Sequence, residues 1–155
     1  MSGCLHMPCN RPEWLDFTDR RNAVYSVVAG SLFAIGWWIM IDCAARHPSS
    51  AELNHAYHTI GVISTLSLIM VNVVSNAQVR GERVFTNGVC GPAGARVWLF
   101  IGFVLGFAAL LGSSWILVAT NFYSTSLSVF LQNAFIFASS MAFKFGRKES
   151  DSWGS

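Results

Sequence analysis

Two long segments without a charged side chain restrict the fold of this chain more than any other feature. No Asp, Glu, Lys, Arg or His occurs in residues 22–41 or in residues 97–143. A helix needs about 20 mostly apolar residues to cross the roughly 30 Å hydrocarbon core of a bilayer. Only 12% of the 155 residues are charged, whereas a soluble domain has about 25%. The two segments therefore predict membrane-spanning helices.

We expect four such spans, in an all-α membrane protein that forms a single domain over residues 1–155 with short cytosolic tails. The predicted spans are residues 22–41, 57–76, 97–120 and 127–145. Only residues 121–126 join the last two spans, so these two must form an antiparallel hairpin. The residues before the first span are polar, so we expect that span to act as an uncleaved signal anchor.

Basic residues orient the predicted bundle, because cytosolic loops carry an excess of Lys and Arg. With four spans, one side of the membrane receives Arg11, Arg20, Arg21, Arg80, Arg83, Arg96, Lys144, Arg147 and Lys148. The other side receives only Arg46. We therefore predict that both termini are cytosolic.

The charge pattern argues against several classes of function. A net charge of +2 is too small to suggest a nucleic-acid partner. No Asp or Glu lies inside a predicted span, although a proton-coupled transporter normally needs one. No nucleophile and base stand at a spacing typical of a catalytic pair. We expect no enzymatic activity and no cofactor.

A group of polar residues is expected at the lumenal side of the membrane. Its members are Asp42, Cys43, His47, His55 and His58. The two last histidines are three residues apart at the start of a helix, a spacing that suits zinc in principle. Two further ligands at a defined spacing are not evident. We therefore expect a polar cap that holds the first helical hairpin, and no metal site.

One face of the second span is polar. It carries His58, Thr65, Asn72 and Asn76, with Gly61 and Leu68 on the same stripe. An unpaired amide in hydrocarbon costs several kcal/mol, so this face should avoid lipid. Interhelical hydrogen bonding is the favoured interpretation, and a polar path or ligand site is the alternative. We expect Asn72 and Asn76 to mark the place where span two meets span three or a partner.

Span four carries two adjacent amides, Gln132 and Asn133. Neighbouring helix positions point about 100° apart, so the two side chains cannot serve one contact. We expect one of them to meet span two and the other a different neighbour. If Gln132 pairs with a side chain, it should do so at the level of Thr65 or His58.

Span three carries a stripe of small residues, formed by Gly102, Gly106, Ala109 and Gly112. Small residues let two helix backbones approach closely in a membrane. A specific helix–helix contact is the favoured interpretation. The alternative is a groove for a lipid tail or for a helix of another protein.

The segment before the first span, residues 13–21, mixes charged and aromatic residues. It suits either a short helix lying in the membrane interface or a disordered tail. Cys4 and Cys9 precede it and are candidates for acylation.

A series of motifs resembles the transmembrane protein 50 family. The motifs are Gly36-Trp37-Trp38 through Asp42, Asn54-His55-Ala56-Tyr57-His58, Val74-Ser75-Asn76-Ala77-Gln78-Val79-Arg80-Gly81, Gly94-Ala95-Arg96-Val97-Trp98-Leu99-Phe100, Gln132-Asn133-Ala134-Phe135-Ile136-Phe137 and Phe143-Lys144-Phe145-Gly146-Arg147. They occur in order over residues 21–148. The resemblance implies a small four-span protein of the endoplasmic reticulum and Golgi, without an assigned enzymatic activity.

Three hypotheses for function follow. The leading one is a non-enzymatic accessory or scaffolding subunit of a larger endomembrane protein complex, in lipid handling or trafficking. The alternative is a homo-oligomeric channel or lipid carrier, and the third is a membrane enzyme that uses His55 and His58. The expected partners are other integral membrane proteins and membrane lipids, whose anionic headgroups Arg80, Arg83 and Arg96 can reach.

Overall fold

Four helices make up the computed structural model, which describes residues 13–48, 55–75, 79, 91–121 and 123–147. The helices are α1 (Glu13–Arg46), α2 (His55–Val73), α4 (Pro92–Ala119) and α5 (Tyr123–Gly146). Each is long and apolar enough to cross a membrane, and the described residues contain no strand. The expected all-α fold with four transmembrane helices is confirmed.

α1 and α5 both begin earlier than the predicted spans. α1 has 34 residues and runs without a break from Glu13, so residues 13–21 form neither a separate interfacial helix nor a disordered tail. At 1.5 Å per residue α1 is about 51 Å long, which exceeds the hydrocarbon thickness. α5 begins at Tyr123 rather than near Leu127. The apolar pattern marks the hydrocarbon, whereas helical hydrogen bonding continues into polar residues on either side.

Local chemistry explains where α4 begins and ends. Pro92 occupies the first turn, where its missing N–H costs nothing and its fixed φ suits a helix. At the other end, the Thr120 N–H and hydroxyl both donate to the Ile116 carbonyl, at 3.1 and 2.6 Å. Thr120 then turns to extended backbone. The chain reverses within a few residues, which places α4 and α5 antiparallel.

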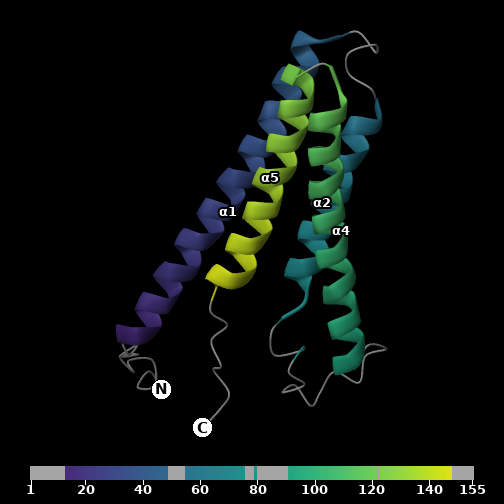
Figure 1. The fold of residues 1–155 in the computed structure, drawn as a ribbon. Coiled ribbons are helices and arrows are strands. Elements are labelled where there is room, and N and C mark those ends of the chain that lie inside the picture. Colours follow the sequence, from purple (N-terminus) through teal and green to yellow (C-terminus); the bar gives the residue numbers. More distant parts are fainter. Residues whose placement is uncertain (1–12, 49–54, 76–78, 80–90, 122, 148–155) are drawn as a thin grey trace, which may run out of the picture.

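α5 is the central helix of the bundle. It packs against α1, α2 and α4, and α2 also packs against α4. Among the described helices, α5 is the only one whose backbone comes close to that of α1. In Figure 1 the α1–α5 pair and the α2–α4 pair meet at one end and diverge towards the end where α1 begins.

The charged residues separate the two ends of the bundle. We define the basic end as the end where α1 and α4 begin and α2 and α5 finish. Its described basic residues are Arg20, Arg21, Arg96, Lys144 and Arg147. Arg46 lies at the opposite end, where α1 finishes. The assignment of the basic end to the cytosol stays a prediction.

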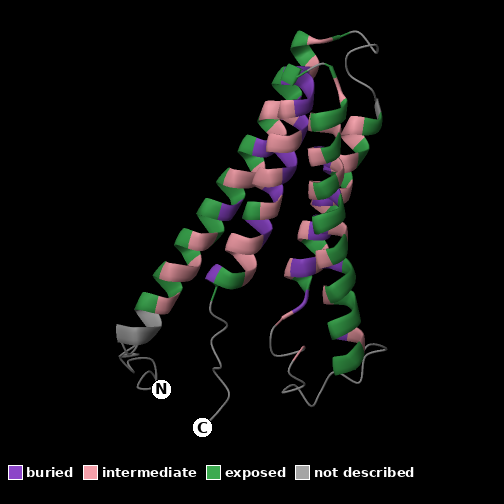
Figure 2. Cartoon of the chain, viewed as in Figure 1, coloured by how far each residue is buried: buried purple, intermediate pink, exposed green. Residues whose placement is uncertain are grey.

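This bundle exposes many large apolar side chains and buries polar side chains beside apolar ones. Figure 2 shows exposed residues along all four helices. Among them, Trp115 is 76% exposed and Val118 is 86% exposed. The buried polar residues are Ser64, Ser67, Ser113, Thr125, Ser126, Gln132, Asn133, Ser139 and Ser140. Lipid accepts the apolar surface, while small and polar side chains form the contacts between helices.

Candidate functional site: a polar core between the helices

One face of α5 supplies the polar core. Its buried residues recur at intervals of three or four, which places them on a single stripe. They are Thr125, Ser126, Val129, Gln132, Asn133, Ile136, Ser139 and Ser140. Because α5 lies between the other helices, this stripe contacts α1 along one edge and α2 along the other.

Asn133 is fully buried and makes hydrogen bonds through both ends of its amide. The Ser64 hydroxyl of α2 donates to its Oδ1, and its Nδ2 donates to the Val129 carbonyl at 2.8 Å. A buried amide with both groups bonded carries little desolvation penalty. This pair therefore ties α5 to α2 in the interior of the bundle.

Gln132 is fully buried too, but neither Oε1 nor Nε2 has a hydrogen-bond partner in the part of the chain that the structure describes. Its side chain lies against Gly61, where an added Cβ would fall 2.5 Å from Nε2. The backbone carbonyl oxygen of Gln132 lies against α1, 3.1 Å from the position that a Cβ on Gly36 would take. Gln132 thus occupies the junction of α1, α2 and α5.

The level expected for Gln132 agrees with this position, since Gly61 lies between His58 and Thr65. However, Gln132 bonds to neither of them. The Thr65 hydroxyl donates to the Gly61 carbonyl at 2.9 Å and accepts from Trp37 Nε1 at 3.2 Å. His58 is half-buried. Gln132 and Asn133 both contact α2, whereas the sequence suggested two different neighbours.

Asn72 faces α5 rather than α4. Its Nδ2 donates to the Leu68 carbonyl at 2.7 Å and to Ser140 Oγ at 3.4 Å, while Oδ1 is buried without a partner in the described chain. The neighbouring Ser139 donates to the Ala29 carbonyl of α1 at 2.6 Å. Ser140 therefore contacts α2, and the adjacent Ser139 contacts α1. Asn76 lies outside the described residues.

The small residues of α4 form its contact with α2. A Cβ on Gly102 would lie 2.9 Å from Val71 Cγ2, and one on Gly106 would lie 2.7 Å from Ser67 Oγ. Ser67 also donates to the Gly102 carbonyl at 2.6 Å. At these two glycines α2 occupies the groove, which the alternative interpretation of the sequence had assigned to a lipid tail or to a helix of another protein.

The stripe on α4 continues differently from the expected one. Ala109 is buried, but a Cβ on Gly112 would meet no atom within 4 Å. Ser113 is the fully buried residue of that turn. Positions 102, 106, 109 and 113 keep the spacing of one helix face, which a search for small hydroxyl residues as well as glycines could have identified.

The buried face of α2 is rotated by one position from the expected stripe. It shares Gly61 with that stripe and continues through Ser64, Ser67 and Val71 to Val74, just after the helix. One residue step is about 100° on a helix, so Thr65, Leu68 and Asn72 lie at the edge of the contact. The two serines were missed because a hydroxyl gives a weaker polar signal in a sequence than an amide or an imidazole.

Two basic residues bind backbone carbonyls after the end of α2. Lys144 Nζ donates to the Val74 carbonyl at 2.5 Å, and Arg96 Nε donates to the Val79 carbonyl at 3.0 Å. The Val74 carbonyl directly follows α2, where carbonyls lack intrahelical partners and carry partial negative charge that a cation such as Lys144 stabilises. The sequence pattern had assigned Lys144 to membrane orientation, and Arg96 to orientation and to contact with lipid headgroups.

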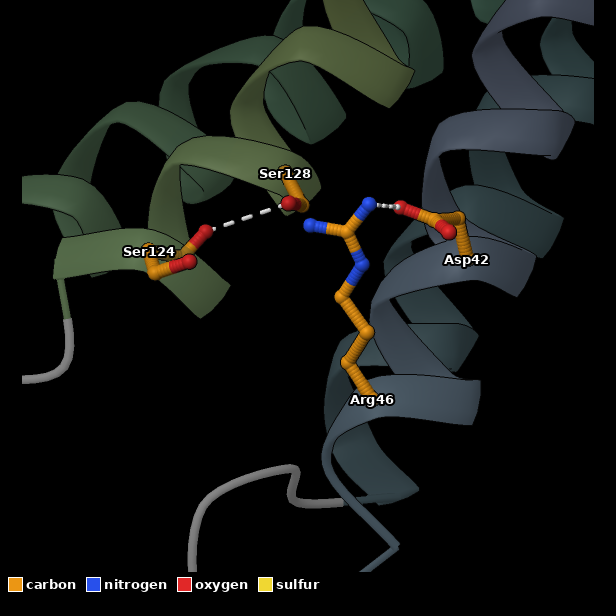
Figure 3. Close-up of polar contacts among 4 residues, drawn as sticks. All are labelled: Asp42, Arg46, Ser124 and Ser128. Atoms are coloured by element: carbon orange, nitrogen blue, oxygen red, sulfur yellow. Dashed lines mark hydrogen bonds and ion pairs between the residues drawn. The ribbon is translucent and has the colours of Figure 1, made fainter.

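The opposite end of the bundle carries an exposed ion pair. Arg46 lies 3.0 Å from Asp42, one turn earlier on α1, and extends towards the start of α5 where Ser128 donates to the Ser124 carbonyl at 3.1 Å (Figure 3). An exposed pair of this type contributes less than about 1 kcal/mol. In the described residues, no group of three His, Cys, Asp or Glu could hold a metal ion.

Apolar packing dominates beneath that ion pair. Cys43 is a buried free thiol that packs with Met40 and Val129, and Tyr57 of α2 lies against this cluster. Asp42 is exposed, and the contact that Tyr57 makes with this cluster is apolar. The polar cap expected for the first hairpin stays a prediction. No side-chain position is described for His55.

Comparison with known proteins gives a consistent result. The chain matches, over residues 6–153, a family described as an uncharacterised protein family, UPF0220. It is also similar to a transmembrane protein 50 homolog of Dictyostelium discoideum, with 26% identity over 141 residues that cover 80% of this chain and 89% of the relative. No solved structure matches the chain.

Proposed function

Because the chain belongs to the uncharacterised protein family UPF0220 and is a multi-pass membrane protein, we propose that it is a non-enzymatic accessory or scaffolding subunit of a larger membrane complex. The transmembrane protein 50 homolog among its relatives supports the resemblance found in the motifs. We place the complex in the endoplasmic reticulum or Golgi, as that resemblance implies. Lipid handling and trafficking are the processes in which we would look for it.

The tight filling of the interior supports a structural role. At Gly61, Gly102 and Gly106 a side chain of the adjoining helix lies within 3 Å of the position that an added Cβ would take, at 2.5, 2.9 and 2.7 Å. The serines and Asn133 make their hydrogen bonds within the bundle. These contacts use the polar residues to hold the four helices together, so a partner has to bind the outer faces.

α1 offers the least covered outer face. The helix packs against α5 alone at the level of the backbone. Its exposed side includes the small residues Ala23, Ser26, Gly30 and Ala34, which share one face. A Cβ on Gly30 would meet no atom within 4 Å. Small residues on an exposed transmembrane face suit close packing by another helix. This face of α1 is the observation on which the proposal depends.

The test is affinity purification from membranes in mild detergent, followed by mass spectrometry. We expect a stoichiometric integral membrane partner with the wild-type chain and its loss with Gly30→Leu. Gly112→Leu is the matched control, because Gly112 is also a helical glycine with open space before it. A monodisperse monomer without a partner, or equal partner recovery from the two variants, would contradict the proposal.

A further inference from the structure

Two arginines at the basic end lie over aromatic rings of their own helices. The Arg21 guanidinium carbon is 5.6 Å from the centre of the Tyr25 ring on α1. The Arg147 guanidinium carbon, just after α5, is 4.8 Å from the centre of the Phe143 ring. A ring face attracts a cation and limits the conformations of a long side chain. Each guanidinium group therefore has a preferred position on its ring before any ligand binds.

The residues next to these two arginines form a contact between α1 and α5. The Tyr25 ring lies directly against the backbone of Gly146, so that a Cβ there would overlap Cδ1 and Cγ of the ring. Arg21 therefore lies on the ring that packs against Gly146, and Arg147 is the residue that follows Gly146.

These arginines differ from the other basic residues of this end. Lys144 and Arg96 donate to the Val74 and Val79 carbonyls. In contrast, Arg20, Arg21 and Arg147 make no ion pair or hydrogen bond in the part of the chain that the structure describes. The guanidinium N–H groups of these three residues remain available to an anion.

The position along the helices indicates where the anion would come from. Arg21 immediately precedes the uncharged segment of α1, residues 22–41, and Arg147 lies one turn after the uncharged segment that finishes at Phe143. Both arginines therefore stand at the boundary of the hydrocarbon, at the level of the lipid headgroups. A planar guanidinium suits bidentate contact with phosphate oxygens.

We propose that Arg21 and Arg147 bind the phosphate of an anionic phospholipid headgroup at the basic end of the α1–α5 pair. This site is distinct from the exposed face of α1 that the proposed partner would use, and it does not depend on that partner. Its experiment measures lipid affinity instead of partner recovery.

The experiment uses the full chain purified in a neutral detergent and titrated with a fluorescent short-chain phosphatidylglycerol. The variant Arg21→Gln/Arg147→Gln should bind this lipid at least tenfold more weakly, since each arginine near a lipid surface contributes about fivefold in affinity. Arg46→Gln is the control for charge, because Arg46 lies at the opposite end and pairs with Asp42. It should leave the lipid affinity unchanged.

A second variant, Arg21→Lys/Arg147→Lys, keeps both charges and the cation–ring contacts but removes the planar fork. We expect this folded variant to retain part of the affinity, between the wild type and the glutamine variant. An equal loss of affinity in Arg46→Gln, or wild-type affinity in the glutamine variant, would overturn the proposal. Competition by millimolar inorganic phosphate as strong as that by phosphatidylglycerol would overturn the assignment to a lipid.

Discussion

The side chain of Gln132 lies against the Cα of Gly61, so closely that a methyl group on Gly61 would fall 2.5 Å from Nε2 of Gln132. A long amide on α5 is accommodated only because α2 has no side chain at this level. The contact brings a fully buried amide without a hydrogen-bond partner to the centre of the described helices. At this junction the Gln132 side chain fits closely against Gly61, but burial leaves its amide without a hydrogen-bond partner in the described chain.

The first prediction concerns the steric side of this contact. Gly61→Ala should lower the free energy of unfolding by about 1–3 kcal/mol, because Gln132 or the α2–α5 spacing must shift to admit the methyl group. Gly112→Ala is the control, since open space faces Gly112 and alanine favours a helix. Thermal unfolding in detergent measures both. Equal melting temperatures would show that Gln132 moves aside without cost.

The second prediction concerns the two adjacent amides. Gln132→Leu should stabilise the bundle by about 1–3 kcal/mol, because it removes two buried polar groups that lack partners. Asn133→Leu should destabilise it by a similar amount, because the Ser64 hydroxyl loses its acceptor. Detergent unfolding of the two variants should therefore give shifts of opposite sign. Destabilisation by Gln132→Leu would show that its amide is satisfied in the membrane.

The third prediction tests the α2–α4 contact. Gly102→Leu or Gly106→Leu should reduce folded yield and thermal stability strongly, since Val71 and Ser67 occupy the space that the new side chain needs. Leu105→Ile, on the half-buried side of the same turn, conserves volume and should cost less than about 1.5 kcal/mol. Similar behaviour of all three variants would mean that α2 and α4 do not pack at these glycines.

The fourth prediction concerns orientation. Both termini should lie in the cytosol, because five of the six described Lys and Arg residues lie at the basic end. A glycosylation sequon introduced within residues 42–56 should be modified if it stands far enough from the membrane. One placed within residues 77–95 should remain unmodified. Gel mobility with and without a glycosidase reads out both, and modification of the second site would reverse the predicted topology.

Some features follow from local properties that a sequence displays directly. The number of spans follows from the length of uncharged apolar segments, because hydrocarbon thickness sets that length for every helix. The number of spans in turn decides which Lys and Arg residues lie at the same end of the bundle. Gly102 and Gly106 were also visible as a contact surface, since two small residues four apart lie on one helix face. Each of these inferences needs only one helix at a time.

Other features were decided by the tertiary structure alone. The central place of α5, the meeting of Gln132 with Gly61 and the capping of α2 by Lys144 each depend on a second helix. In a membrane the outer surface is as apolar as a core, so hydrophobic periodicity does not mark the buried face. A hydroxyl can also bond to its own helix, as Thr65 and Thr120 do with carbonyls four residues earlier. A polar residue in a span therefore does not reveal its neighbour, and only the packing of the four helices determined that Ser64 and Ser67 lie inside while Thr65 lies at the edge.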